Sequence, residues 1–243
     1  MSVQRPDPAL DAAAVHTATE RLIEAVAALT ASAVAEPSLL PGWTRGHVLT
    51  HLARNADSLV NLLTWARTGE EIPQYASTEI RDKDIEDGAN RPLSEHLDDL
   101  RISADRFAMA VQVTPSRAWA SQVRMRSGKV IAAAEIPWRR LVEINFHHVD
   151  LGIGIGFDDL PADFTGRQLD ALLDSLSGHE GVAAVRLHDT GSGSTWDLGA
   201  ANAPELTVSG TGNALLAWVS GRAKGEGLAT NPDHPLPVLP PLI

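Results

Sequence analysis

The sequence predicts an α+β protein with two domains: an N-terminal antiparallel four-helix bundle and a smaller α+β domain with an antiparallel sheet. Three observations lead to this prediction. Helical spacing of apolar residues dominates the first half of the chain, strand-like runs appear only in the second half, and 243 residues suffice for two hydrophobic cores. The composition changes near residues 152–159, so we expect domains of residues 1–155 and 156–243.

Four segments of the first half carry apolar residues at helical spacing and have start or stop signals at their ends. Asp7-Pro8 is typical of a cap followed by proline in the first turn. Thr44 can cap the second segment, and Gly69 ends it. The predicted helices span about residues 8–36, 44–69, 92–111 and 137–149. Polar side chains that face the interior of such a bundle commonly build metal sites.

The remaining segments predict loops, strands and two further helices. Residues 70–92 are polar and lack periodicity, so we expect a long surface loop there, and residues 123–131 can form a short hairpin around Ser127-Gly128. The second half predicts helices at about 161–177 and 213–220 and strands at 182–187, 195–198 and 206–209. This pattern favours an antiparallel sheet packed with helices, followed by a proline-rich tail.

Charge and hydropathy limit the partners of the chain. The formal net charge is -11 and Lys and Arg form no stripe, which argues against binding nucleic acid through its phosphates. No apolar run approaches the length of about 20 residues that spans a bilayer, and the polar N-terminus does not resemble a signal peptide. We therefore expect no membrane contact and a cytoplasmic location. A small anionic substrate would need local arginines in this acidic protein.

Cysteine is absent from the chain. The sequence therefore excludes disulfides, thiolate metal ligands and a nucleophilic protein thiol. Any metal must be held by His, Asp, Glu or backbone oxygen, and any thiol chemistry must use a thiol from outside the protein.

Two pairs of residues are candidates for metal binding. His47 and His51 lie four residues apart on the second predicted helix, and Glu143 and His147 repeat that spacing on the fourth. Residues at this spacing project from one face of a helix. One or two histidines from one helix, with the Glu and His of the other, would give the His₂Glu set of catalytic zinc sites, which keep a coordination position open.

Simpler interpretations exist for these residues. Each histidine taken singly could be a half-buried side chain bonded to a backbone carbonyl, and Glu143 could lie on a solvated face and pair with Arg139. Asp150, three residues after His147, could accept a hydrogen bond from a ligand imidazole or end the helix in solvent. His148 points about 100° away from His147 around the helix and is a poorer candidate.

Three other patterns have simple structural explanations. The triplet Asp189-Thr190-Gly191 occurs once, whereas aspartic proteases need two carboxylates that share a proton. The glycines at 152, 154 and 156 follow a predicted helix, which is the wrong context for a dinucleotide loop. Arg222 ends the last predicted helix, where a cation favours the helix dipole.

Taken together, three motifs resemble those of the mycothiol-dependent maleylpyruvate isomerase family. They are GWTRGHVLTHLA at 42–53, E-x-x-x-H-x-V-D-L-G at 143–152 and SGR at 220–222, and the resemblance covers essentially the whole chain. It implies a DinB-like N-terminal bundle, a zinc ion and a C-terminal domain that contributes Arg222 to catalysis. It also favours His51 over His47. The implied metal ligands are His51, Glu143 and His147. From their spacing alone, we expect His47, Asp150 and Arg139 to support these ligands or contact the substrate.

The resemblance also implies an activity. Mycothiol is an exogenous thiol, and a thiol bound to zinc is deprotonated. Its thiolate would add to the cis double bond of maleylpyruvate, a dicarboxylate, and leave after rotation to give fumarylpyruvate, a step of gentisate degradation in aromatic catabolism. Arg222 would anchor the substrate carboxylate. Two alternatives stay open, a mycothiol S-transferase that consumes the thiol and a non-catalytic protein that binds a ligand.

Overall fold

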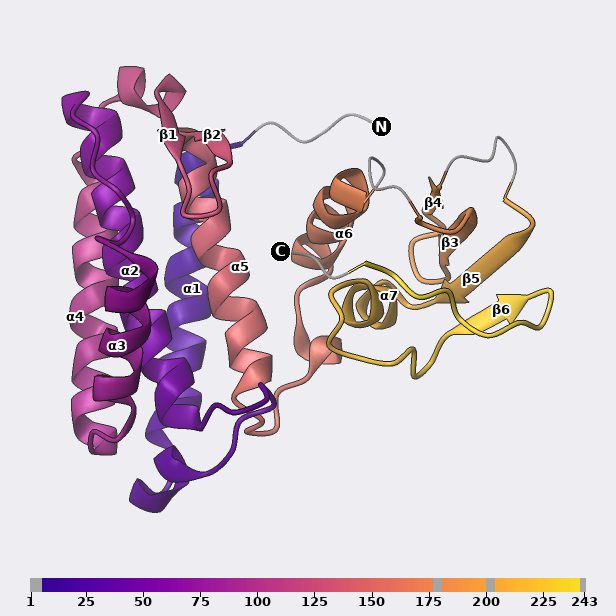
Figure 1. Cartoon of the computed structure of the whole chain (residues 1–243), viewed down its shortest axis with the longest axis horizontal. Coiled ribbons are helices and arrows are strands. Elements are labelled where there is room, and N and C mark those ends of the chain that lie inside the picture. The colour runs from indigo at the N-terminus through magenta and orange to yellow at the C-terminus, as the bar shows by residue number, and fades with distance from the viewer. Residues whose placement is uncertain (1–5, 177–180, 200–203, 241–243) are drawn as a thin grey trace. The chain divides into compact units, whose positions relative to one another are not determined.

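The structure is a computed structural model that describes residues 6–176, 181–199 and 204–240. The chain divides into two compact units between Ile155 and Gly156. The first unit is helical and the second combines helices with a sheet, so the predicted α+β class is confirmed (Figure 1).

Four long helices form the bundle of the first unit. They are α1 (Pro8–Ala27), α2 (Arg45–Thr68), α4 (Leu93–Gln112) and α5 (Ile136–Asp150). Helix α2 packs against α4 and α5, and α1 packs against the same two helices (Figure 1). The interior is apolar, as the helical spacing predicts. Completely buried side chains include Leu22, Val26, Leu52, Leu62 and Ile144.

The predicted caps fix the beginning of α1 and both ends of α2. Asp7 accepts hydrogen bonds from the backbone N–H groups of Ala9 and Leu10, both at 3.1 Å. Thr44 and His47 bond each other in a capping box at the start of α2, which ends where Gly69 takes a φ of 79°. Helix α1 ends earlier than predicted, at Ala27. Thr30 is extended and the 3-10 helix η1 (Ala31–Ala35) follows, because a turn there buries Ala33 and Val34.

The prediction of a loop at residues 70–92 is wrong, because α3 (Thr78–Ala89) forms within it. Ser77 caps this helix by accepting from the N–H of Ile80. Helix α3 lies outside the bundle against α2 and buries only Ile85, Gly88 and Ala89 (Figure 1). Its apolar face is therefore too narrow to produce a clear helical period.

Small residues allow the close packing of α3 on α2. A Cβ atom added at Gly46 would come within 1.9 Å of the carbonyl oxygen of Ala89, and one added at Gly88 would meet the side chain of Thr50 at 2.5 Å. The predicted hairpin is also present, with β1 (Gln122–Arg124) paired to β2 (Val130–Ala132) between the 3-10 helices η2 (Ser116–Ala120) and η3 (Ala133–Glu135).

The second unit follows η4 (Phe157–Asp159) and packs two helices with a four-stranded sheet. Its elements are α6 (Ala162–Leu176), β3 (Val185–Asp189), β4 (Thr195–Leu198), β5 (Leu206–Gly210), α7 (Gly212–Val219) and β6 (Ala229–Asn231). The predicted end of the first of these helices, at residue 177, lies outside the described residues.

The sheet is mixed, which corrects the prediction of an antiparallel sheet. Its order is β4-β3-β5-β6, and the pair formed by β3 and β5 is parallel. Both Leu198 at the end of β4 and Leu206 at the start of β5 lie beside Val185 of β3. The chain thus passes from one side of β3 to the other, and β5 must run in the same direction as β3. The sequence prediction missed β6, three residues in the proline-rich tail.

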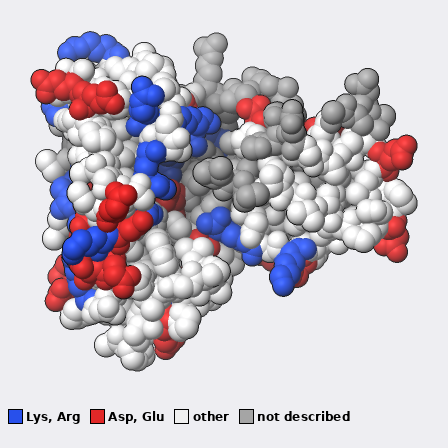
Figure 2. Space-filling model, in the orientation of Figure 1, with Lys and Arg blue, Asp and Glu red and all other residues white. Residues whose placement is uncertain are grey.

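No helix among residues 6–176, 181–199 and 204–240 has both the length and the apolar composition needed to cross a bilayer. Figure 2 shows acidic and basic side chains interspersed over the visible face of the bundle.

Candidate metal centre

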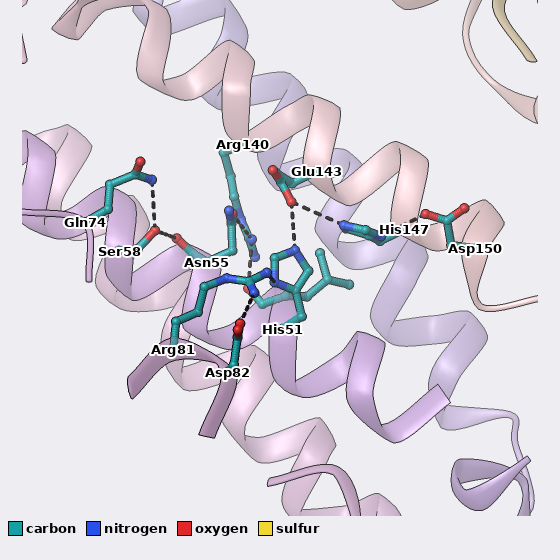
Figure 3. A network of polar contacts seen from close by, with 11 residues as sticks. His51, Asn55, Ser58, Gln74, Arg81, Asp82, Arg140, Glu143, His147 and Asp150 are labelled. Carbon is teal, nitrogen blue, oxygen red and sulfur yellow. Dashed lines mark hydrogen bonds and ion pairs between the residues drawn. The ribbon is translucent and has the colours of Figure 1, made fainter. Parts of the chain in front are cut away.

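Helices α2 and α5 bring three predicted ligands together. His51 Nε2 lies 3.0 Å from Glu143 Oε2, and His147 Nε2 lies 3.3 Å from the same oxygen. One ligand atom from each of the three side chains lies within 4.8 Å of the others. Figure 3 shows Glu143 between the two imidazole rings. In the described part of the chain, these residues form the one group of three His, Cys, Asp or Glu with such spacing.

The local sequence explains this convergence. Glu143 and His147 lie one turn apart on α5 and therefore point the same way. His51 lies on a buried face of α2 between Val48, three residues before it, and Asn55, four residues after it, and α2 packs against α5. The rings of His51 and His147 meet edge to face, with centroids 4.7 Å apart and planes at 86°.

The donor set fits a divalent metal ion. Two imidazole nitrogens and a carboxylate oxygen are the ligands that zinc takes in catalytic sites. His147 Nδ1 lies 2.9 Å from Asp150 Oδ2, and in the neutral ring a proton held there would let Nε2 present its lone pair to a cation. The side chain of Glu143 keeps 34% of its surface exposed, so the cluster is accessible from solvent. The other two rings are more buried.

Burial and hydrogen bonds set the charges of the cluster. Burial raises the pKa of Glu143, but hydrogen bonds from His147 and His51 outweigh it and leave this pKa well below its usual value. Glu143 is therefore an ionised carboxylate. Burial lowers the pKa of His51, and the bond to Glu143 offsets this only in part. His51 is thus a neutral imidazole at neutral pH, as a metal ligand must be.

For the second ligand imidazole, His147, hydrogen bonds outweigh burial in their effect on the pKa. Burial acts to lower the pKa of His147, but the hydrogen bonds with Asp150 and Glu143 are together stronger and leave it raised. Two carboxylates therefore surround this ring and favour a positive charge at its position. A bound cation would receive the same stabilisation.

Other candidate residues lie outside the cluster. The ring of His47 is engaged at both nitrogens, since Nδ1 lies 2.7 Å from Thr44 Oγ1 and Nε2 lies 3.1 Å from Glu86. Arg139 pairs with Glu135 at 3.2 Å, so the predicted alternative in which it pairs with Glu143 is wrong. His148 is buried but is not part of the three-ligand group.

Arg222 belongs to the second unit, just after α7, where it is exposed. Its backbone N–H donates to the carbonyl of Ala217 at 2.9 Å, which closes the end of that helix. The catalytic role that the resemblance implies for Arg222 stays a prediction.

The sequence prediction missed two arginines next to the cluster. Arg140 is only 2% exposed and donates from Nη1 to the carbonyl of Leu52 and to Asn55 Oδ1, both at 2.8 Å. Burial lowers its pKa to about 10. Arg81 of α3 lies beside His51, with Nη2 3.3 Å from Nδ1 (Figure 3). Arg140 precedes Glu143 by three residues, a spacing that could have predicted it; Arg81 was hidden in the expected loop.

Comparison with known proteins identifies the family. The model of the mycothiol maleylpyruvate isomerase N-terminal domain matches residues 15–152, which include the whole cluster. The chain belongs to this family. The resemblance inferred from the three sequence motifs is thereby confirmed, and the cluster lies in the mycothiol maleylpyruvate isomerase N-terminal domain.

Solved structures similar to this maleylpyruvate isomerase family member include a crystal structure of the mycothiol-dependent maleylpyruvate isomerase. It is 27% identical, with a TM-score of 0.89 over 97% of each chain. A histidine-to-alanine mutant of that enzyme has the same identity and coverage and a TM-score of 0.88. YfiT from Bacillus subtilis, described as a probable metal-dependent hydrolase with an unusual four-helix bundle topology, is 16% identical. Its TM-score is 0.52 over 62% of this chain and 87% of its own, which supports the fold alone. No match was found among curated protein sequences.

Proposed function

We propose that the chain is a zinc- and mycothiol-dependent isomerase that converts maleylpyruvate to fumarylpyruvate. The observation that carries the proposal is the group formed by His51, Glu143 and His147 in a member of the maleylpyruvate isomerase family. The likeness along 97% of the chain to the mycothiol-dependent enzyme supports the same activity.

His51, Glu143 and His147 would hold the divalent cation. Their nitrogen and oxygen atoms favour zinc, which as a Lewis acid lowers the pKa of a thiol that binds it. Since the chain has no cysteine, that thiol comes from outside, which is the place of mycothiol in the proposal.

The residues around the cluster preorganise it. Asp150 fixes the ring of His147, and only 3% of its own side chain is exposed, so it holds this orientation away from water. Trp43 packs at a tilt on His51, with ring centroids 5.7 Å apart. The two imidazoles therefore lose little freedom when a ligand binds. The exposed part of Glu143 marks the side from which substrates would reach the cluster.

In the proposed reaction, a C–S bond forms at one carbon of the cis double bond of maleylpyruvate while the π electron pair moves into the conjugated ketone as an enolate, which leaves a single bond that can rotate. The C–S bond then breaks and the double bond returns in the trans form, so the thiol is regenerated. Arg222 would bind a substrate carboxylate through paired N–H donors. A role in gentisate degradation and a cytoplasmic location belong to the same proposal and rest on the family resemblance.

The test is an absorbance assay of maleylpyruvate isomerisation with zinc-loaded protein, with and without mycothiol. Wild type should turn over only with the thiol, and the free thiol concentration should be the same before and after. His51→Ala should lose activity. Consumption of the thiol would instead identify a transferase, and turnover without any thiol would contradict the proposal.

A further inference from the structure

Arg81 is placed at the metal centre by a helix that is not part of the bundle. Its guanidinium lies 3.3 Å from His51 Nδ1, and its side chain is 15% exposed. The guanidinium carbon lies 5.8 Å from the centre of the Tyr75 ring, a distance at which cation–π attraction holds the group in place. Its other contact is Asp82 at 2.6 Å, an exposed carboxylate on the solvent side (Figure 3).

The bond between Arg81 and His51 defines one tautomer of the ring. A guanidinium only donates hydrogen bonds, so Nδ1 of His51 must accept and the ring proton must lie on Nε2. That proton is then donated to Glu143 Oε2 at 3.0 Å. The two distances describe a consistent chain of donors from Arg81 through His51 to Glu143.

The same contact conflicts with metal binding through Nε2. A neutral ring that gives its Nε2 lone pair to a cation carries its proton on Nδ1. Two donors, this N–H group and the guanidinium, would then face each other at 3.3 Å. The other ligand ring shows the usual arrangement, in which a carboxylate, Asp150, accepts from Nδ1 of His147.

Three other arginines of the described first unit are already engaged. Arg140 is buried and bonded to Leu52 and Asn55. Arg45 donates to the carbonyl groups of Leu151 and Gly152, and Arg139 pairs with Glu135. Arg81 lies beside His51, a predicted metal ligand. Its carboxylate partner, Asp82, is exposed to solvent, so Arg81 can exchange it for another carboxylate at little cost.

We propose that Arg81 leaves His51 when a divalent cation occupies the cluster, and that it then binds a carboxylate of the dicarboxylate substrate. This inference rests on the proposed function and adds a substrate-binding residue from the same unit as the metal ligands. Arginine suits the role because its paired N–H donors match a carboxylate. Maleate, a four-carbon cis-dicarboxylate, is the probe of this site, because it does not turn over in the absence of a thiol.

The test measures binding of Zn²⁺ and then of maleate by calorimetry, on wild type and Arg81→Gln, without turnover. Loss of a like charge a few ångströms from the cation should tighten zinc binding by about tenfold. Loss of the carboxylate partner should weaken maleate binding to the zinc-loaded protein by about tenfold. Lys83→Gln is the matched control, since this exposed lysine of the same helix pairs with Asp87, and it should bind both as wild type does.

Arg81→Met, which keeps an unbranched apolar side chain beside Tyr75, replaces the first variant if Arg81→Gln does not fold. Unchanged zinc affinity or unchanged maleate affinity in the folded variant would overturn the inference, as would zinc-loaded wild type that does not bind maleate. If wild type binds zinc and isomerises maleylpyruvate, any of these three results overturns only the inference on Arg81, and the proposed function remains. Wild type that binds no zinc would overturn both.

Discussion

His51 Nε2 lies 3.0 Å from Glu143 Oε2, so two residues that are 92 positions apart in the sequence join α2 to α5 at the cluster. His147 shares the same carboxylate oxygen at 3.3 Å. Glu143 thus places one negative charge between two imidazole rings, at the position where a cation would bind. The predictions below test the parts of the structure that position these residues.

Asp150 should control the metal affinity through His147. Replacing it by Asn leaves the ring near its place but removes the charge that lies 2.9 Å from Nδ1. Zinc affinity, measured by competition with a coloured chelator, should fall by about 10- to 100-fold. Asp98→Asn, an exposed change on α4, is the control and should have no effect. Equal affinity of Asp150→Asn and wild type would show that this carboxylate does not support the ligand.

Arg140 should contribute strongly to stability because it is buried. Arg140→Ala removes the donor to Leu52 and Asn55 and leaves a cavity. The free energy of unfolding in urea should fall by about 3 kcal/mol.

The control for this change is Arg101→Ala, which removes a half-exposed partner of Asp98 on α4 and should cost less than about 1 kcal/mol. If both variants lose the same free energy, the buried contacts of Arg140 do not stabilise the bundle.

Close packing of α3 on α2 should fail in Gly46→Ala. The new Cβ would lie 1.9 Å from the carbonyl oxygen of Ala89, so one of the helices must shift. We expect a loss of about 1–3 kcal/mol in unfolding free energy and faster amide hydrogen exchange in α3.

A second glycine separates this steric effect from helix propensity. Gly166 lies inside α6, and apart from its chain neighbours and the nearby backbone of α6 itself, no heavy atom lies within 4 Å of an added Cβ. Gly166→Ala should therefore stabilise the protein by about 1 kcal/mol. Exchange in α3 that is as slow in Gly46→Ala as in wild type would contradict the packing derived from the structure.

His96 should make the stability depend on pH. Burial lowers its pKa from 6.5, the unfolded value, and Arg91 adds to this, while a hydrogen bond to the backbone of Ala89 opposes it in part. Between the two pKa values the unfolded chain binds the extra proton, so the unfolding free energy of metal-free protein should fall as the pH drops below 6.5 toward the lower folded pKa.

His96→Gln should reduce this loss of stability, measured by urea unfolding at several pH values in that window. His16→Gln is the control, because His16 is exposed on α1 and should keep the wild-type slope. A wild-type slope in His96→Gln would mean that the buried ring does not cause the dependence.

Much of the bundle could be predicted from the sequence because local signals and core periodicity agree there. Thr44 and Gly69 mark α2 almost to the residue, and the Glu143–His147 spacing places both side chains on one face. The choice between His47 and His51 could not come from spacing. It depends on the capping bond of His47 to Thr44 and on its contact with Glu86 in α3.

The missed features depend on contacts between distant segments. Helix α3 has one narrow buried face, so its period is weak, and Arg81 was assigned to a loop. The direction of β5 follows from the passage of the chain past β3, which strand propensity does not record. Arg140 lies on the inward face of α5, but its buried position depends on acceptors that α2 supplies.

The most direct test of the central claim is the absorption spectrum of Co²⁺-substituted protein titrated with mycothiol. If His51, Glu143 and His147 hold a cation with a position open to sulfur, the thiol should produce a thiolate-to-cobalt charge-transfer band that saturates at one thiol per metal. Glu143→Ala should lose the metal and the band. Stoichiometric cobalt in wild type with no new band at saturating thiol would contradict the account.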